Sequence, residues 1–212
     1  WPVRWMNCLP WPAATITWNP VDDVQVRGGF SKTITRPQFR ELTPAIFIDD
    51  ATDLAYRGNP FLKNTQIDNY DARAEYYFGR GRFVTLGGFY KTLDGPIEEA
   101  IDRDLGGFEF VSFINAPSAK IYGFEFEFEN TWPVSELVDW NFMSAKDVVF
   151  KTNYTWSKSR VSNQGDVSTS ALNPLTRRVD EQVLPGSSVF EDGRALQGQS
   201  RHLFNLQIGV ED

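Results

Sequence analysis

Residues 120–129 read Lys120-Ile121-Tyr122-Gly123-Phe124-Glu125-Phe126-Glu127-Phe128-Glu129. Aromatic rings occupy every even position from Tyr122 to Phe128, whereas Gly123 and the glutamates occupy the odd positions. A β-strand points alternate side chains to opposite faces, and a helix would scatter both kinds around its circumference. This stretch therefore predicts a strand with one aromatic face and one charged face.

The same two-residue period recurs along most of the chain. From Tyr70 the even positions carry Tyr, Ala and Phe, and the odd positions are mostly charged. We expect seven strands, near residues 13–19, 24–34, 68–79, 82–103, 108–130, 147–158 and 201–211. Gly95-Pro96 and Ala116-Pro117 interrupt the two longest strands, and we expect β-bulges there rather than strand ends. A short helical turn is expected within residues 134–145.

Connections of very different length join these strands. Residues 19–23 and 79–81 form tight turns, whereas residues 35–67 and 159–200 are long and lack a regular pattern. In an up-and-down sheet, both long connections and the hairpin tip at 104–107 fall at the same end. Long irregular loops are uncommon in compact soluble domains. Long loops at one rim and short turns at the other are typical of outer-membrane barrels.

The composition limits the possible classes of function. The 212 residues include 21 Lys and Arg against 28 Asp and Glu, a net charge of −7, and this acidic balance argues against nucleic-acid binding. Cys8 and His202 are the single members of their kinds, which removes Cys-cluster zinc sites and most histidine metal sites. No nucleophile motif, phosphate loop or dinucleotide fingerprint is present. We therefore expect no catalytic residues, no metal, no cofactor and no nucleic-acid partner.

Two architectures fit the alternation of aromatic and polar residues. In a soluble sandwich the aromatic faces form a core between two sheets, whereas in a membrane barrel they meet lipid and the polar faces line the lumen. Strand length favours the barrel, because crossing the apolar layer takes ~9–11 residues. The loop asymmetry also favours it. So do aromatic residues near strand ends, where interfacial belts form, such as Trp18, Tyr70, Tyr90 and Trp156.

Several short motifs, taken in order, resemble the barrel of TonB-dependent outer-membrane receptors. They lie at residues 30–44 (FSKTITRPQFRELTP), 58–62 (GNPFL), 69–78 (NYDARAEYYF), 88–91 (GFYK), 115–117 (NAP), 122–127 (YGFEFE) and 153–157 (NYTWS). Their order and spacing carry the resemblance, which covers about residues 13–212. Residues 1–12 stay unassigned. Arg36-Pro37 and Gly58-Asn59-Pro60 are interpreted as turn chemistry near the mouth.

This resemblance implies an all-β, antiparallel, up-and-down transmembrane barrel of about twenty-two strands around a plug. About seven strands, with long extracellular loops, are expected in this chain, which makes it an incomplete segment. The resemblance further implies uptake of a ferric siderophore, cobalamin or a carbohydrate across the outer membrane of a Gram-negative bacterium. The implied partners are outer-membrane lipid, the receptor's own plug domain, the TonB protein and a small-molecule substrate. The plug and the TonB-contacting segment are not expected within this chain.

Charged residues of the lumen face and the loops are the candidate substrate-binding residues. They are Arg27, Arg36, Arg40, Arg73, Glu75, Glu125, Glu127 and Lys151. Arg27, Arg73 and Lys151 suit an anionic substrate. Alternatively, they form salt bridges with lumen carboxylates such as Asp71 or Glu75. The glutamates of residues 125–129 are interpreted as a hydrated wall rather than an acid–base or cation site.

Other classes of protein remain open on the sequence alone. A passive porin-type or adhesion barrel would have similar strands without a plug. A soluble carbohydrate-binding sandwich would stack its aromatic rings on sugars. All barrel interpretations depend on one assignment, that the rings of alternate residues meet lipid. Rings that meet one another across two stacked layers would refute it.

Overall fold

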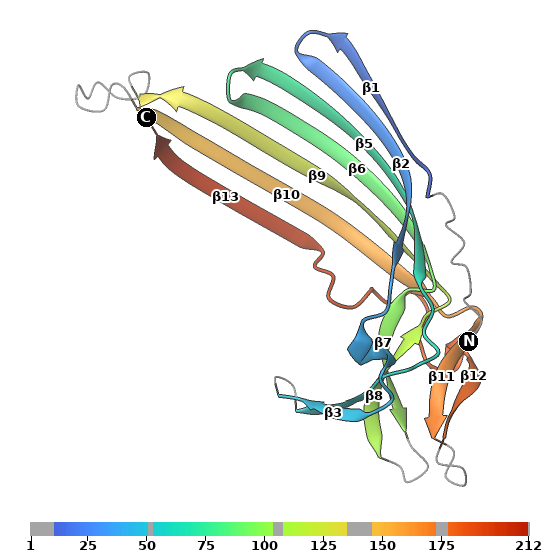
Figure 1. Ribbon diagram of the computed structural model, residues 1–212. Coiled ribbons are helices and arrows are strands. Elements are labelled where there is room, and N and C mark those ends of the chain that lie inside the picture. The colour runs from blue at the N-terminus through green and yellow to red at the C-terminus, as the bar shows by residue number, and fades with distance from the viewer. Residues whose placement is uncertain (1–10, 51–52, 104–107, 135–145, 173–177, 212) are drawn as a thin grey trace, which may run out of the picture.

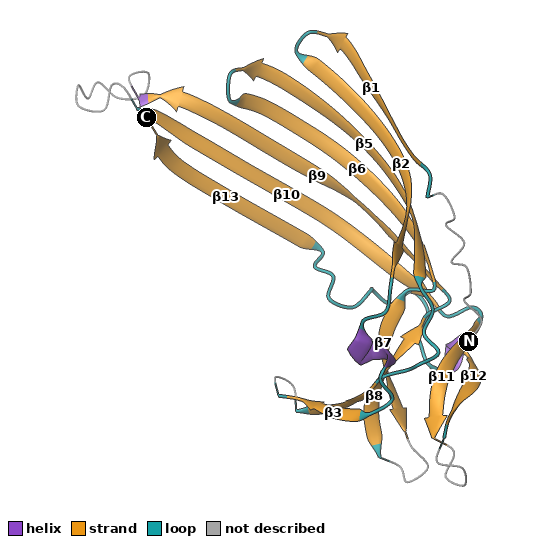
Figure 2. Cartoon of the chain, in the orientation of Figure 1, coloured by secondary structure: helices purple, strands orange, loops and turns teal. Residues whose placement is uncertain are grey.

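The computed structural model describes residues 11–50, 53–103, 108–134, 146–172 and 178–211. Strands dominate it, and its largest element is a seven-stranded antiparallel sheet (Figures 1 and 2). The order across this sheet is β1 (Ala13–Val21), β2 (Val24–Thr35), β5 (Thr65–Gly79), β6 (Arg82–Asp94), β9 (Ser118–Pro133), β10 (Asp147–Ser162) and β13 (His202–Glu211). Neighbours in space follow one another along the chain. The up-and-down topology and the seven expected strands are therefore confirmed.

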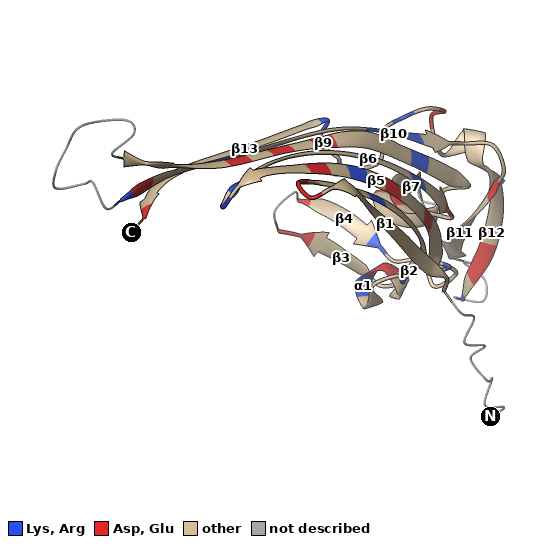
Figure 3. Ribbon diagram, turned by 90° about the horizontal axis from the view of Figure 1, so that it is seen from above, with Lys and Arg blue, Asp and Glu red and all other residues tan. Residues whose placement is uncertain are grey.

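The seven-stranded sheet is a single curved layer with two chemically different faces (Figure 3). Cross-strand register places even-numbered residues together on one side, called the outer face. One row of it runs through Trp18, Val26, Ala74, Leu86, Phe126, Tyr154 and Phe204. Phe126 is 37% exposed and Phe204 is 65% exposed, so no second layer covers these rings. Odd-numbered, mostly polar residues form the opposite, inner face.

The long connections fold together at one end of the sheet, called the loop end (Figure 1). Their elements are α1 (Phe39–Leu42), β3 (Ile46–Asp49), β4 (Leu54–Arg57), β7 (Ile97–Arg103), β8 (Glu109–Asn115), β11 (Asp166–Leu172), β12 (Val179–Pro185) and the 3-10 helix η2 (Gly186–Ser188). They form a four-stranded sheet of order β3-β4-β8-β7 and a β11-β12 hairpin. The expectation of irregular long connections was wrong, because each contains a short hairpin, and β4 of one connection also pairs with β8 of another. The opposite end, called the turn end, carries the turns at 22–23 and 80–81.

The two longest predicted strands end at the loop end instead of continuing through bulges. Gly95 has a φ of +63° and precedes Pro96, which has no N–H for the strand ladder, so β6 stops and β7 starts anew. The side chain of Asn115 holds this corner by donating to the carbonyl oxygens of Gly95 (2.7 Å) and Lys63 (3.0 Å). The expected bulges at 93–96 and 115–118 were therefore wrong, because each break passes the chain into a second sheet.

Most of the apolar core lies at the loop end. One cluster consists of Ile114, Ala116, Ala119, Val161, Val167 and Phe190, and a second of Tyr56, Val111 and Phe113. Ala119 and Val161 are inner-face residues of β9 and β10, so the first cluster joins the large sheet to the small ones. Neither cluster extends to the middle of the large sheet. The apolar groups there need a partner outside this chain, which is the role of lipid in a barrel wall.

The helical turn expected within residues 134–145 lies, apart from Val134, outside the described residues, as does the hairpin tip at 104–107. None of the helices that the structure describes is long and apolar enough to span a membrane.

Candidate functional site

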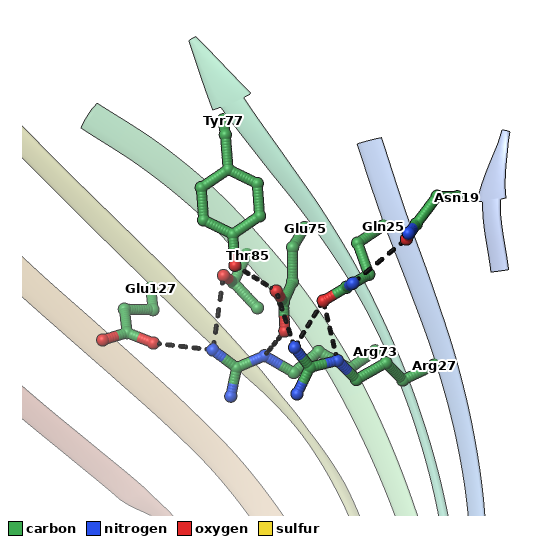
Figure 4. A network of polar contacts seen from close by, with 8 residues as sticks. All are labelled: Asn19, Gln25, Arg27, Arg73, Glu75, Tyr77, Thr85 and Glu127. Carbon is green, nitrogen blue, oxygen red and sulfur yellow. Dashed lines mark hydrogen bonds and ion pairs between the residues drawn. The ribbon is translucent and has the colours of Figure 1, made fainter. Parts of the chain in front are cut away.

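Polar side chains of the inner face join neighbouring strands into one network (Figure 4). Arg73 on β5 lies at its middle: its Nε is 2.9 Å from Glu75 and its Nη2 is 3.1 Å from Glu127 on β9. Nη2 of Arg73 is also 3.4 Å from the hydroxyl of Thr85 on β6. On β2, Arg27 lies 3.8 Å from the carboxylate of Glu75. The network thus ties β2, β5, β6 and β9 across the inner face.

Glu75 is the most enclosed charged member of this network, with a side chain only 4% exposed. A buried carboxylate is costly unless it is paired and hydrogen-bonded. Glu75 receives both kinds of support, from the guanidinium groups of Arg27 and Arg73 and from the hydroxyl of Tyr77, which donates to it. Its geometry is that of a structural anchor of the wall.

The three basic residues predicted to bind an anion each have a carboxylate partner. Arg27 and Arg73 lie beside Glu75, and Nζ of Lys151 lies 3.0 Å from Glu129. This arrangement agrees with the alternative interpretation, in which lumen cations pair with lumen carboxylates. Asp71 is not a partner in the ion pairs of the described residues. Substrate binding by Arg27, Arg73, Lys151 and their partners stays a prediction.

A hollow of about 420 Å³ lies on the inner face, on the loop-end side of the network. Asp71 on β5, Lys91 on β6 and Glu125 on β9 line it, and none of the three makes an ion pair within the described residues. Charges without a partner are available to a group that enters the hollow. Glu125 was predicted as a substrate-binding residue, whereas Asp71 was predicted only as a salt-bridge partner and Lys91 was not named as a candidate. Their odd positions, shared with Arg73, were the signal that could have found them.

A second cavity, of about 470 Å³, opens where the inner face meets the small sheets. Arg36, Glu41 and Glu99 line it, so this predicted arginine does reach a concave site. Arg40 lies exposed on α1 and is not one of the lining residues. Within the part of the chain that the structure describes, no three Asp, Glu, His or Cys side chains are grouped closely enough to hold a metal ion.

Glu98 forms the buried wall of this second cavity. Its carboxylate lies 2.7 Å from Nη2 of Arg194 and accepts a hydrogen bond from the N–H of Gln197. Burial raises the pKa of Glu98 above its ordinary value of 4.5, although the charge of Arg194 and the N–H of Gln197 act in the opposite direction. The nearby carboxylate of Glu99 adds to the upward shift.

The comparisons with known proteins identify the architecture. The profile of a family described as TonB dependent receptor-like, beta-barrel, matches residues 11–211. This chain belongs to that family. Its members are receptors and transporters rather than enzymes. Family membership makes the large sheet part of the wall of a membrane-embedded barrel.

The fold is shared with the solved structure of a siderophore receptor. The siderophore receptor PirA from Pseudomonas aeruginosa matches with a TM-score of 0.53 at 14% identity, over 76% of this chain and 30% of PirA. A mutant of the ferric enterobactin receptor PfeA from the same organism, in complex with enterobactin, matches with a TM-score of 0.48 at 18% identity, over 75% of this chain and 25% of that protein. No curated protein matches the chain in sequence. The chain thus spans less than a third of the length of PirA.

The aromatic residues expected in interfacial belts lie on the outer face of this wall. Tyr70 and Tyr90 are cross-strand neighbours with ring centroids 6.3 Å apart, near the loop end. Trp156 packs against Phe124 with centroids 5.7 Å apart, and Trp18 lies on β1 near the turn end.

Asn59 links separate strands of the loop end through side-chain hydrogen bonds. The sequence predicted only a turn at residues 58–60 and not this role. The side chain of Asn59 is fully buried and donates to the carbonyl oxygens of Phe113 on β8 (3.0 Å) and Ser168 on β11 (2.9 Å). The preceding Gly58 passes so close to the backbone that a Cβ would lie 2.4 Å from the oxygen of Thr43. Asn59 therefore joins the long connection 35–67 to the β7–β8 hairpin and to the long connection 159–200.

Proposed function

We propose that this chain forms part of the wall and outer loops of an energy-coupled importer in the outer membrane of a Gram-negative bacterium. Residues 13–212 belong to the barrel domain, residues 1–12 lead into it, and the rest of the receptor supplies the remaining strands and the plug. The imported solute is scarce, namely a ferric siderophore, cobalamin or a carbohydrate. A periplasmic TonB protein supplies the energy.

The family match over residues 11–211 is the observation that carries this proposal. Two features of the sheet support it. Its aromatic face is uncovered, as a lipid-facing wall requires. The sheet itself is curved, as the wall of a barrel requires (Figure 3). PirA is a siderophore receptor, so ferric siderophores are the first solutes to test.

The candidate residues divide into two groups in this proposal. The paired charges Arg27, Arg73, Glu75, Glu127 and Lys151 brace the wall, because each already has a partner on a neighbouring residue or strand. Glu125, Asp71 and Lys91 in the inner hollow, and Arg36 at the second cavity, contact the plug or the passing solute. Arg40 extends from α1 toward the outside.

Uptake by the full-length receptor tests the function. We would express it in a Gram-negative host that lacks its own siderophore receptors and measure uptake of labelled ferric siderophores, cobalamin and oligosaccharides, with and without TonB. We expect uptake of one solute that is lost without TonB. Uptake that is independent of TonB would indicate a passive porin-type barrel and contradict the proposal. A receptor that is soluble without detergent would contradict the membrane assignment itself.

A matched pair of glutamates tests the division of the site residues. Glu125→Gln removes an unpaired lumen carboxylate, and we expect it to alter the solute concentration that gives half-maximal uptake. Glu129→Gln is the control, because Glu129 lies on the same strand and face but is already paired with Lys151. Equal effects of the two changes on uptake would contradict the division.

A further inference from the structure

A basic hollow lies on the outer side of the large sheet at its loop end. It measures about 540 Å³ and is lined by Lys120 on β9, Lys158 and Arg160 on β10, and Arg201 just before β13. Asp192 is the only carboxylate among the residues that line it. The small loop-end strands do not contribute to it, so it is distinct from the cavities of the inner face.

The strand positions show why these cations face outward. Lys120 is even-numbered like Tyr122 on the same strand, and Lys158 and Arg160 are even-numbered like Trp156. All three therefore lie on the outer face, beyond its aromatic rings. The residues of opposite parity beside them, Ala119 and Val161, are buried in the loop-end core. The basic side chains therefore project from the other side of β9 and β10, away from the lumen. Figure 3 shows basic residues, in blue, along β10.

These four cations gather in one hollow without a counter-charge. Lys120 and Arg160 are directly opposite each other in the β9–β10 register, an arrangement of like charges that is destabilising. Neither they, nor Lys158, nor Arg201 forms an ion pair within the described residues. On the same outer face, by contrast, Lys32 lies 3.0 Å from Asp68.

Asp192 does not neutralise the group. It is one carboxylate against four cations, and its Oδ1 accepts a hydrogen bond from the backbone N–H of Asn163 (3.3 Å). The nearest outer-face acid on β6, Asp94, lies opposite Ser118, two residue pairs further along the strand than Lys120. The hollow therefore has an excess of positive charge at the loop end, just beyond the aromatic rings of the outer face.

We propose that this basic hollow binds the phosphate groups of a lipid headgroup in the leaflet at the loop end, an inference that rests on the membrane placement of the proposed function. Long basic side chains at the edge of an apolar band extend toward the headgroup layer, and polybasic surfaces attract anionic lipids there. Arg and Lys together suit phosphate, through the guanidinium fork and the compact ammonium. One phosphate between Lys120 and Arg160 would remove their mutual repulsion.

Lipid binding by the delipidated full-length receptor tests this site. Native mass spectrometry would compare diphosphorylated lipid A with the same lipid after removal of its phosphates. We expect the wild type to prefer the phosphorylated lipid, and Lys120→Gln with Arg160→Gln to weaken binding of that lipid by ~10-fold or more while leaving the dephosphorylated lipid unaffected. The charge-conserving exchange of Lys120→Arg with Arg160→Lys should retain the preference. Lys63→Gln, an exposed loop-end lysine outside the hollow, is the control.

Several results would overturn the proposal. These are equal binding of the two lipids by the wild type, unchanged binding by the double variant, or displacement of the lipid by an equal concentration of inorganic phosphate, which would indicate a site for a free anion. If the double variant does not fold, Lys158→Gln alone must reduce the preference. Loss of TonB-dependent uptake with an intact lipid preference would refute the proposed function and leave this site standing. The reverse result would refute this site alone.

Discussion

The assignment of the two faces makes a quantitative prediction for Phe126→Arg in the full-length receptor. Tyr122 and Trp132 mark the ends of the aromatic outer face of β9, and they are ten residues apart. At ~3.4 Å per residue and a strand tilt of ~40°, ten residues span ~25 Å along the membrane normal, which is the height of the apolar band of such barrels. Phe126 lies four residues from Tyr122 and is therefore near the middle of that band.

The depth of Phe126 sets the size of the effect. An arginine on the lipid face costs ~2–4 kcal/mol at the midplane and ~0–1 kcal/mol near the interfaces. The adjacent Glu127→Gln removes the ion pair with Arg73, whose two side chains are 44% and 43% exposed, so this change should cost at most ~1 kcal/mol. Neighbouring positions of one strand should thus differ several-fold in their effect, because they point to different solvents.

Reversible urea unfolding of the receptor in lipid vesicles measures both changes. Phe126→Leu is the control for loss of the ring, because it keeps the site apolar. We expect the wild type, Phe126→Leu and Glu127→Gln to have similar free energies of unfolding. We expect Phe126→Arg to have a much lower one. Equal losses for Phe126→Arg and Glu127→Gln would refute the face assignment, and with it the lipid-facing wall.

Three further predictions concern the loop end and the sheet edges. Asn59→Ala leaves the buried carbonyl oxygens of Phe113 and Ser168 without their donor, at ~1–3 kcal/mol each, and hydrogen exchange in β8 and β11 should accelerate; unchanged exchange would contradict the role of Asn59 as a fastener. Because the pKa of Glu98 is raised in the folded state, the folded loop end binds a proton more readily than the unfolded one, so its stability should fall as pH rises from 4.5 through the raised pKa and then level off. Glu98→Gln should abolish this slope, and a slope that persists in the variant would assign it to another group. Finally, the 212-residue chain alone should aggregate in plain buffer, because β1 and β13 are unpaired edges of the sheet, and a sharp cooperative melt of a soluble monomer would contradict this.

Local pattern was sufficient to predict the large sheet. Alternation is a property of each strand by itself, so residues 120–129 indicated a two-faced strand without knowledge of its neighbours. Turn length then gave the order of the strands. The four-stranded sheet of the loop end was not predicted because the pairing that joins its two hairpins is not local: Tyr56 on β4 pairs in parallel with Val111 on β8, far along the chain. For the same reason Gly95-Pro96 was interpreted as a bulge, because a break within a sheet and a passage to another sheet have the same local sequence.

The odd or even position of a charged residue assigns it to a face of the sheet. The register between strands decides whether it has an oppositely charged partner. Arg73 and Lys91 both occupy odd positions and both lie on the inner face, yet Arg73 lies beside Glu75 and Glu127, whereas Lys91 lies opposite Asn69 and Ile121. One residue of slip in a strand would reverse its faces, whereas a slip of two would keep them and exchange every partner. The distinction between charges that brace the wall and charges free to bind therefore depends on a quantity that the alternation does not contain. That quantity is the register of the paired strands. The unpaired charges of Lys120 and Arg160 could therefore be recognised only in the structure.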